Sequence, residues 1–418
     1  MSDARASIAT ATRESRLVRA RRVMADFGPG FVLAATGIGV GDMVSATIAG
    51  AEYGLTLIWA LAAGVVLKFA ITEGLARWQL ATDTTLLEGW RNHLHPIVLA
   101  TFGVYFVVWT YVVSSAMVAA SAMVPSALVP AVPQPVWGLI HAVAAFALVY
   151  WGTYERFVTI MKVFIGLMFG SVIATNLLIV AGGVDTSRFG SHAALSLPYT
   201  LALIGGVGGT VTMLSYGYWI REQRWHGPER LTAVRTDLTS SYALVFVFAL
   251  SMIFLSTQIE WQGQILREGP NLCLLLADRI GAEIGPVGRF VFLVGFWGAA
   301  SASLLGVWNG VPYLFDDWIH RWRGTPAQGP SGRAYRGYLA YMTAAALSTV
   351  FLQRPVWLIF VYTVVGSLFF PFVIATLLWL NTRAALVTPR LRNGIVVNVI
   401  LALALLLYVY LGARELLA

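Results

Sequence analysis

The stretch Gly37-Ile38-Gly39-Val40-Gly41-Asp42 interrupts an otherwise apolar segment with three alternating glycines and ends in a carboxylate. A second interruption, Gly205-Gly206-Val207-Gly208-Gly209, occupies the matching place in the second half of the chain. Close helix packing is the simpler reading, but it needs only a GxxxG spacing. Unpaired backbone survives at membrane depth only where it is buried in protein or lines a cavity. The two stretches therefore predict paired helix breaks, which are typical of a transporter's substrate site.

Composition identifies the class of protein. The chain is 58% hydrophobic and 11% charged, whereas soluble domains carry about 25% charged residues. An all-α integral membrane protein follows. The single cysteine, Cys273, excludes a disulfide framework and a cysteine metal cluster. Residues 1–27 contain arginines but no apolar core, so we expect a cytoplasmic N-terminal segment and no cleavable signal.

Eleven stretches are long and apolar enough to span a bilayer as helices, which takes about 17–25 residues each. They are residues 28–53, 55–79, 96–124, 134–152, 157–182, 197–220, 238–257, 286–312, 335–352, 355–380 and 394–413. The broken stretches are the first and the sixth. This spacing predicts one membrane domain, 28–418, made of two inverted five-helix repeats (28–182 and 197–380) followed by an eleventh helix.

Arginines set the expected orientation. They concentrate in the loops around 221–235, 321–336 and 383–392, whereas the loop 125–133 has no charge. Because basic loops stay inside, we expect a multi-pass protein of the cell (inner) membrane with a cytoplasmic N-terminus and an external C-terminus. The net charge of +8 then reflects topology, and no nucleic-acid partner is expected.

Several motifs resemble the Nramp family of divalent-metal transporters. Gly28-Pro29-Gly30-Phe31 and Ala49-Gly50-Ala51-Glu52-Tyr53-Gly54 are similar to the family's GPxF and AGAxYG motifs. Further similarity lies, in order, at 75–77, 82–88, 298–306, 367–372 and 393–410. The resemblance implies a LeuT-type fold and the coupling of metal uptake to proton uptake.

The family's metal ligands are altered in this chain. Its DPGN motif aligns with 39–42, so Gly39 stands at the metal-binding aspartate and Asp42 at the asparagine. Its Met-Pro-His aligns with 212–214, where Met213 is a thioether ligand only after a one-residue shift, and its tenth-helix glutamine aligns with Thr363. The third stretch, 96–124, lacks the acidic residues that usually lie on the proton route.

Asp42 is the first candidate site residue, since an ionisable group at membrane depth is costly and indicates function. It could bind a hard cation through oxygen or carry a coupling proton. The alternative is an N-cap of a half-helix 43–53. The freed backbone of Gly39, Gly41, Gly208 and Gly209, with the side chains of Thr212, Met213 and Thr363, completes the predicted substrate site.

Lys68 and Glu73 are candidate coupling or charge-compensating residues in the second stretch. Lys68 could hold an anion or replace the charge of a mobile cation; the alternatives are an ion pair with Asp42 or Glu73, or snorkelling. For Glu73 the alternative is an ion pair with Arg77 at i+4.

Two substrate classes remain open from the sequence. A hard divalent cation, Mn²⁺ or Mg²⁺, suits a site that keeps a carboxylate but has lost its imidazole ligand and, unless the alignment shifts by one residue to Met213, its thioether ligand. A small anion such as bicarbonate, or a polar solute, suits Lys68 and the half-helix N-termini, with Asp42 serving a coupling H⁺ or Na⁺. No enzymatic motif is present. We expect no cofactor beyond a transported or coupling ion, and a monomer in the lipid bilayer.

Overall fold

A computed structural model describes residues 28–190, 200, 203–205, 207–261, 272–352 and 355–417. The predicted N-terminal segment 1–27 lies outside the described residues. Every regular element in the described part is helical. The α-helices are α2 (Pro29–Gly37), α3 (Val40–Tyr53), α4 (Ile58–Thr82), α5 (Leu86–His93), α6 (Pro96–Leu128), α7 (Gln134–Trp151), α8 (Tyr154–Gly182), α10 (Tyr216–Glu222), α11 (Leu231–Thr257), α12 (Leu272–Arg323), α13 (Arg333–Thr349), α14 (Pro355–Ser367), α15 (Phe369–Thr382) and α16 (Ile395–Leu417).

Short 3₁₀ turns connect several of these helices. They are η1 (Thr186–Phe189), η2 (Val211–Ser215), η3 (Pro228–Arg230), η4 (Gly329–Ser331), η5 (Val350–Leu352) and η6 (Pro389–Leu391).

Length and hydropathy qualify seven of the described helices as membrane spans, and the bent pair α2–α3 is an eighth. These correspond to the predicted stretches 1–5, 7, 8 and 10. The sixth stretch is only partly described, the ninth corresponds to α13, and the eleventh contains a shorter apolar helix at Ile395–Tyr410. The prediction of a helical, multi-pass membrane protein is therefore confirmed.

The eighth and tenth stretches differ from prediction. Helix α12 runs from Leu272 to Arg323, with a non-helical residue at Gly285 (φ 84°) before Pro286. The predicted start at 286 is right, but the preceding helical turns and the extension beyond 312 were missed. The tenth stretch divides at Leu368 into α14 and α15, because Pro371 has no N–H to continue the hydrogen-bond ladder.

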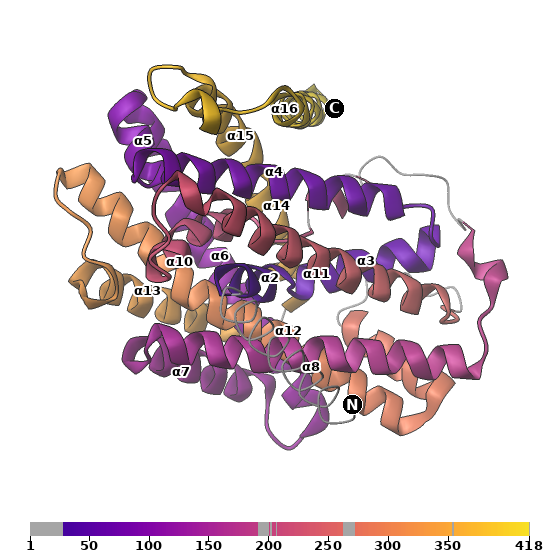
Figure 1. The fold of residues 1–418 in the computed structure, drawn as a ribbon. Coiled ribbons are helices and arrows are strands. Elements are labelled where there is room, and N and C mark those ends of the chain that lie inside the picture. Colours follow the sequence, from indigo (N-terminus) through magenta and orange to yellow (C-terminus); the bar gives the residue numbers. More distant parts are fainter. Residues whose placement is uncertain are drawn as a thin grey trace, which may run out of the picture.

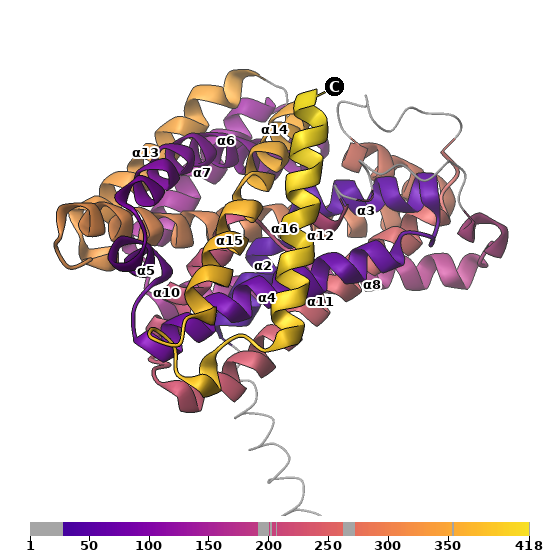
Figure 2. The same cartoon turned by 90° about the horizontal axis from the view of Figure 1, so that it is seen from above.

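The broken helix α2–α3 lies in the centre of the molecule, between α4 on one side and α8 and α12 on the other (Figure 1). Helix α2 ends at Gly37 and α3 begins at Val40, and their axes are bent by 58°. Helix α2 packs on α8, α11 and α12, whereas α16 lies at an edge against α4 and α15 (Figure 2). The first break is thus enclosed by protein on all sides.

Candidate functional site

The two predicted breaks meet in the middle of the fold. A Cβ atom added to Gly37 would lie 3.0 Å from the carbonyl carbon and oxygen of Gly208, a tight contact that the backbone of the second break would have to relieve by moving slightly. Gly208 and Gly209 have φ angles of 82° and 87°, a region that other residues rarely adopt. The chain then passes through η2 before α10 begins. Glycine is therefore favoured at both breaks, by the close approach at Gly37 and by the backbone conformation at Gly208 and Gly209.

Asp42 joins the two breaks through its carboxylate. Its Oδ2 atom accepts a hydrogen bond from the N–H of Gly39 (3.0 Å), and its Oδ1 atom accepts one from the N–H of Gly208 (2.8 Å). Because α3 begins at Val40, Asp42 is the third residue of the helix and not its N-cap, which corrects the predicted half-helix 43–53. One buried carboxylate thus accepts a main-chain hydrogen bond from each unwound stretch.

Lys68 binds the carbonyl groups of the second break. Its side chain is fully buried, and Nζ donates hydrogen bonds to the carbonyl oxygens of Gly205 (2.8 Å) and Gly209 (2.9 Å). The same atom lies 3.5 Å from the ring centroid of Phe370. The contacts of Lys68 are thus main-chain oxygens and an aromatic face, and not the ion pair with Asp42 or Glu73 that was the alternative to a functional role.

Ser303 of α12 binds carbonyl groups of the first break, as Lys68 binds those of the second. Its hydroxyl lies 3.0 Å from the carbonyl oxygen of Thr36 and 3.2 Å from that of Ile38. The hydroxyl of Thr36 donates a hydrogen bond to the carbonyl oxygen of Val32 in the same helix. The freed carbonyls of both breaks are therefore held by polar side chains from neighbouring helices, a hydroxyl in one case and an ammonium in the other.

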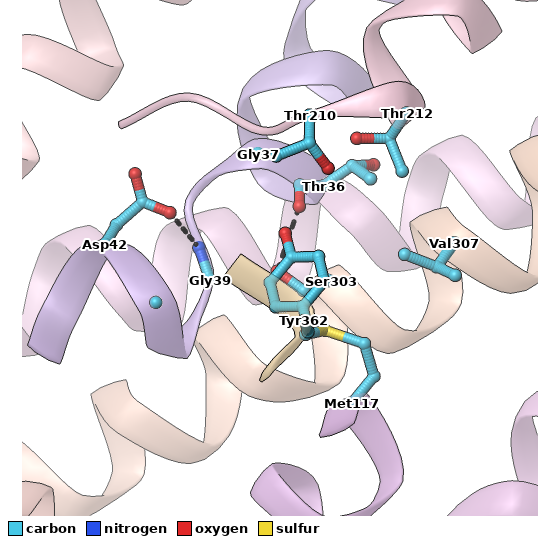
Figure 3. Close-up of a pocket in the computed structure, with 11 residues that line it drawn as sticks. Thr36, Gly37, Gly39, Asp42, Met117, Thr210, Thr212, Ser303, Val307 and Tyr362 are labelled. Atoms are coloured by element: carbon cyan, nitrogen blue, oxygen red, sulfur yellow. Dashed lines mark hydrogen bonds between the residues drawn. The ribbon is translucent and has the colours of Figure 1, made fainter. Parts of the chain in front are cut away.

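A small cavity lies between the breaks (Figure 3). Its volume is about 20 Å³, which suits one water molecule or one ion. Its lining residues are Thr36, Gly37, Gly39, Gly41, Asp42, Met117, Thr210, Thr212, Ser303, Val307 and Tyr362.

Oxygen atoms dominate the polar lining of this cavity. Asp42 supplies the only ionisable carboxylate among the residues that line it, and the buried hydroxyl of Thr210 has no partner of good geometry among the described residues. Met117 of α6 contributes a thioether from the side opposite Thr210 and Thr212 (Figure 3). No group of three or more His, Cys, Asp or Glu side chains that could hold a metal occurs in the described part of the chain. A cation here would have one carboxylate, hydroxyls and water as ligands.

Comparison with known proteins identifies the family. The family profile described as "Natural resistance-associated macrophage protein-like" (Nramp) matches residues 30–418. The chain belongs to the Nramp family. Nramp proteins are divalent-metal transporters, so the resemblance inferred from the motifs is confirmed. No curated protein matches the chain in sequence.

Solved structures place this Nramp chain in the LeuT-type fold. The Eremococcus coleocola manganese transporter, crystallised with an aromatic bis-isothiourea compound, is 14% identical with a TM-score of 0.74, over 93% of this chain and 85% of that one. MhsT bound to L-phenylalanine is also 14% identical, with a TM-score of 0.56 over 91% and 98% of the two chains. At this identity the likeness shows the fold: two inverted five-helix repeats and an eleventh helix, as predicted.

Most of the predicted substrate site of this Nramp protein comes together. Gly39, Gly41, Asp42 and Thr212 line the cavity, and the backbone of Gly208 is bonded to Asp42. Met213 is buried in η2 but is not among the lining residues. The side chain of Thr363 lies outside the described residues, although its neighbour Tyr362 lines the cavity.

Glu73 of α4 is not among the residues that line the cavity, and it lies in a cluster of charged side chains from α4 and α11. It forms ion pairs with Arg77 of α4 (2.7 Å) and with Arg235 of α11 (2.9 Å). Arg77 also donates a hydrogen bond to the carbonyl of Arg392. Glu73 thus joins α4 to α11 beside the loop before α16, and its contacts are those of the i+4 alternative.

The sequence alone did not single out Thr36, Met117, Ser303 or Tyr362. Three of them lie on other helices, and hydroxyl and thioether side chains are common in apolar spans. The available signal for Ser303 was its place in the small-residue stretch 298–306, which lets α12 approach the break.

Proposed function

We propose that this Nramp protein moves a hard divalent cation, Mn²⁺ or Mg²⁺, across the cell membrane by alternating access around the Asp42 cavity. The observation that carries the proposal is the placement of Asp42. Its carboxylate lines the cavity at the point where both unwound stretches touch. A carboxylate at membrane depth between two broken helices is suited to bind and release a cation.

The donor set favours a hard and partly hydrated ion. One carboxylate and several hydroxyls line the space, and Mg²⁺ often keeps water molecules and uses one or two carboxylates. The cavity volume of about 20 Å³ fits the ion alone in this conformation, so we expect the cavity to widen in the state that admits the hydrated ion. Met117 adds one polarisable ligand, which suits Mn²⁺ better than Mg²⁺. We therefore place Mn²⁺ first.

The anion alternative has less support. An anion needs free donors, but the N–H groups of Gly39 and Gly208 already bind Asp42. The Lys68 ammonium is likewise engaged by Gly205, Gly209 and Phe370. An anion would have to displace a carboxylate of its own charge sign from the donors it requires.

Coupling to a proton and the orientation of the chain are parts of the same proposal. The family resemblance supports proton coupling, and Asp42 is the carboxylate in the cavity that could exchange a proton for the metal. The arginine-rich loops support a cytoplasmic N-terminus and an external C-terminus.

Uptake into proteoliposomes tests the proposal. Purified protein should accumulate Mn²⁺, and Mg²⁺ less well, above empty vesicles, with no uptake of labelled bicarbonate. Asp42→Ala should abolish metal uptake. Asp185→Asn, in an exposed ion pair on a loop, is the matched control and should transport normally. Bicarbonate uptake without metal uptake would overturn the proposal in favour of the anion transporter.

A further inference from the structure

The chain has two lysines, and Lys68 is the one that is buried. Its ammonium group has three contacts. Lys162 is the other lysine, and it is exposed on α8. An ammonium group carries three N–H donors. For Lys68, two carbonyl oxygens lie at 2.8 and 2.9 Å and an aromatic ring face at 3.5 Å. The charge is therefore contacted from three sides, and none of these contacts within the described residues is a carboxylate.

These partners are the ligands that a free monovalent cation would use. Unwinding of a membrane helix frees main-chain carbonyls, and such carbonyls coordinate small cations in transporters. Gly205 and Gly209 bracket the second break, and both carbonyl oxygens point at one atom. The face of Phe370 adds a cation–π contact. The seat between these three groups is therefore a cation site whose occupant is part of the chain.

The site that holds the Lys68 ammonium lies next to the Asp42 contact on the second break. Asp42 binds the N–H of Gly208, while Lys68 binds the carbonyl of the next residue, Gly209. A negative and a positive side chain, both from the first repeat, thus bind the main chain of two adjacent residues of the second break. The opposite charges of these two side chains balance each other across the break.

We propose that Lys68 is a tethered cation: its ammonium permanently occupies the seat formed by the Gly205 and Gly209 carbonyls and the Phe370 ring, in place of a free Na⁺ or K⁺. The transport cycle then needs no monovalent metal ion at this seat, and Asp42 is left to the substrate. This inference rests on the proposed function only in treating the Asp42 cavity as the substrate site.

Chemical replacement of the deleted group tests the proposal. Lys68→Ala removes three carbons and the ammonium, which together match n-propylammonium. The melting temperature of the purified variant, measured without divalent metal, should lie below that of the native protein. It should rise with n-propylammonium in a saturable way, but not with n-propanol, which has the same shape without the charge.

The native protein and Lys162→Met are the controls, and their melting temperatures should not respond to the amine. Equal rescue by n-propanol, or no rescue of a folded Lys68→Ala variant, would overturn the proposal. Because the readout is melting without divalent metal, it stands whether or not the protein transports Mn²⁺.

A second variant keeps the proposal testable if Lys68→Ala does not fold. Glutamine at this position can donate a hydrogen bond to the carbonyls but carries no charge. Lys68→Gln should acquire a melting temperature that is higher in Na⁺ or K⁺ than in choline, a dependence that the native protein lacks. Native melting behaviour of Lys68→Gln in all three salts would show that a hydrogen-bond donor suffices, which would overturn the tethered-cation proposal.

Discussion

The Oδ1 atom of Asp42 accepts a 2.8 Å hydrogen bond from the main-chain N–H of Gly208, across 166 residues of sequence. This bond connects the broken helix of the first repeat to the unwound stretch of the second. A cation that binds the carboxylate competes for the same oxygen. Under the proposed function, ion binding at Asp42 is thereby linked to the contact between the two repeats, which alternating access would have to rearrange.

Replacing Asp42 with asparagine should weaken metal binding more than it weakens the fold. The amide oxygen can still accept one of the two main-chain hydrogen bonds, but the negative charge is gone. Losing about 2 kcal/mol of a charged contact corresponds to roughly 30-fold weaker affinity. Calorimetric titration of Mn²⁺ into purified Asp42→Asn measures it. Unchanged affinity would place the metal elsewhere.

Replacing Gly209 with alanine should destabilise the second break. Its φ of 87° is unfavourable for a residue with a Cβ, by about 1–2 kcal/mol. Thermal unfolding in detergent should show a lower midpoint for Gly209→Ala. Gly166→Ala is the matched control, because a Cβ there meets nothing within 4 Å. A control as unstable as Gly209→Ala would contradict the conformational argument.

Replacing Met117 with leucine should alter metal preference. Leucine keeps the apolar volume but removes the one sulfur atom that lines the cavity. Soft cations gain most from a thioether, so inhibition of Mn²⁺ uptake by Cd²⁺ should weaken while inhibition by Mg²⁺ does not. Competition curves in proteoliposomes provide the measurement. Equal Cd²⁺ inhibition in both proteins would show that the sulfur does not touch the ion.

Of the two arginines that pair with Glu73, Arg77 and Arg235, the more buried one should contribute more to the free energy of unfolding. Arg77 has 2% of its side chain exposed, whereas Arg235 has 52% exposed. Breaking a buried ion pair costs about 3–5 kcal/mol, and an exposed one about 0–1 kcal/mol. Arg77→Met should therefore lower the unfolding midpoint far more than Arg235→Met. A stable Glu73→Gln protein that transports metal without proton coupling would instead support the coupling role.

The sequence predicted the breaks because their signal is local. Glycine at alternate positions and in adjacent pairs weakens a helix wherever it occurs, and a carboxylate inside an apolar stretch is conspicuous. Asp42, Gly39, Gly41 and Thr212 do line one cavity in the structure, and their role in binding substrate stays a prediction. The start of α3 at Val40 was missed because helix boundaries depend on one or two hydrogen bonds.

The remaining features depend on tertiary contacts. Lys68 has no acidic partner within its own helix, and nothing in its neighbourhood in sequence indicates carbonyls of residues 205 and 209. The extension of α12 past Pro312 carries Asp317, which is satisfied by Thr85 and Tyr218 from other elements. Such compensation arises only in the folded chain, so hydropathy did not predict that the helix continues to Arg323.

The most direct test of the central claim locates the ion. Crystals of the protein grown with Mn²⁺ should give an anomalous difference peak in the cavity of Figure 3, about 2–2.5 Å from a carboxylate oxygen of Asp42. The same experiment on Asp42→Asn should give no peak there. A manganese peak at any other place in the native protein, with the cavity empty, would contradict the account.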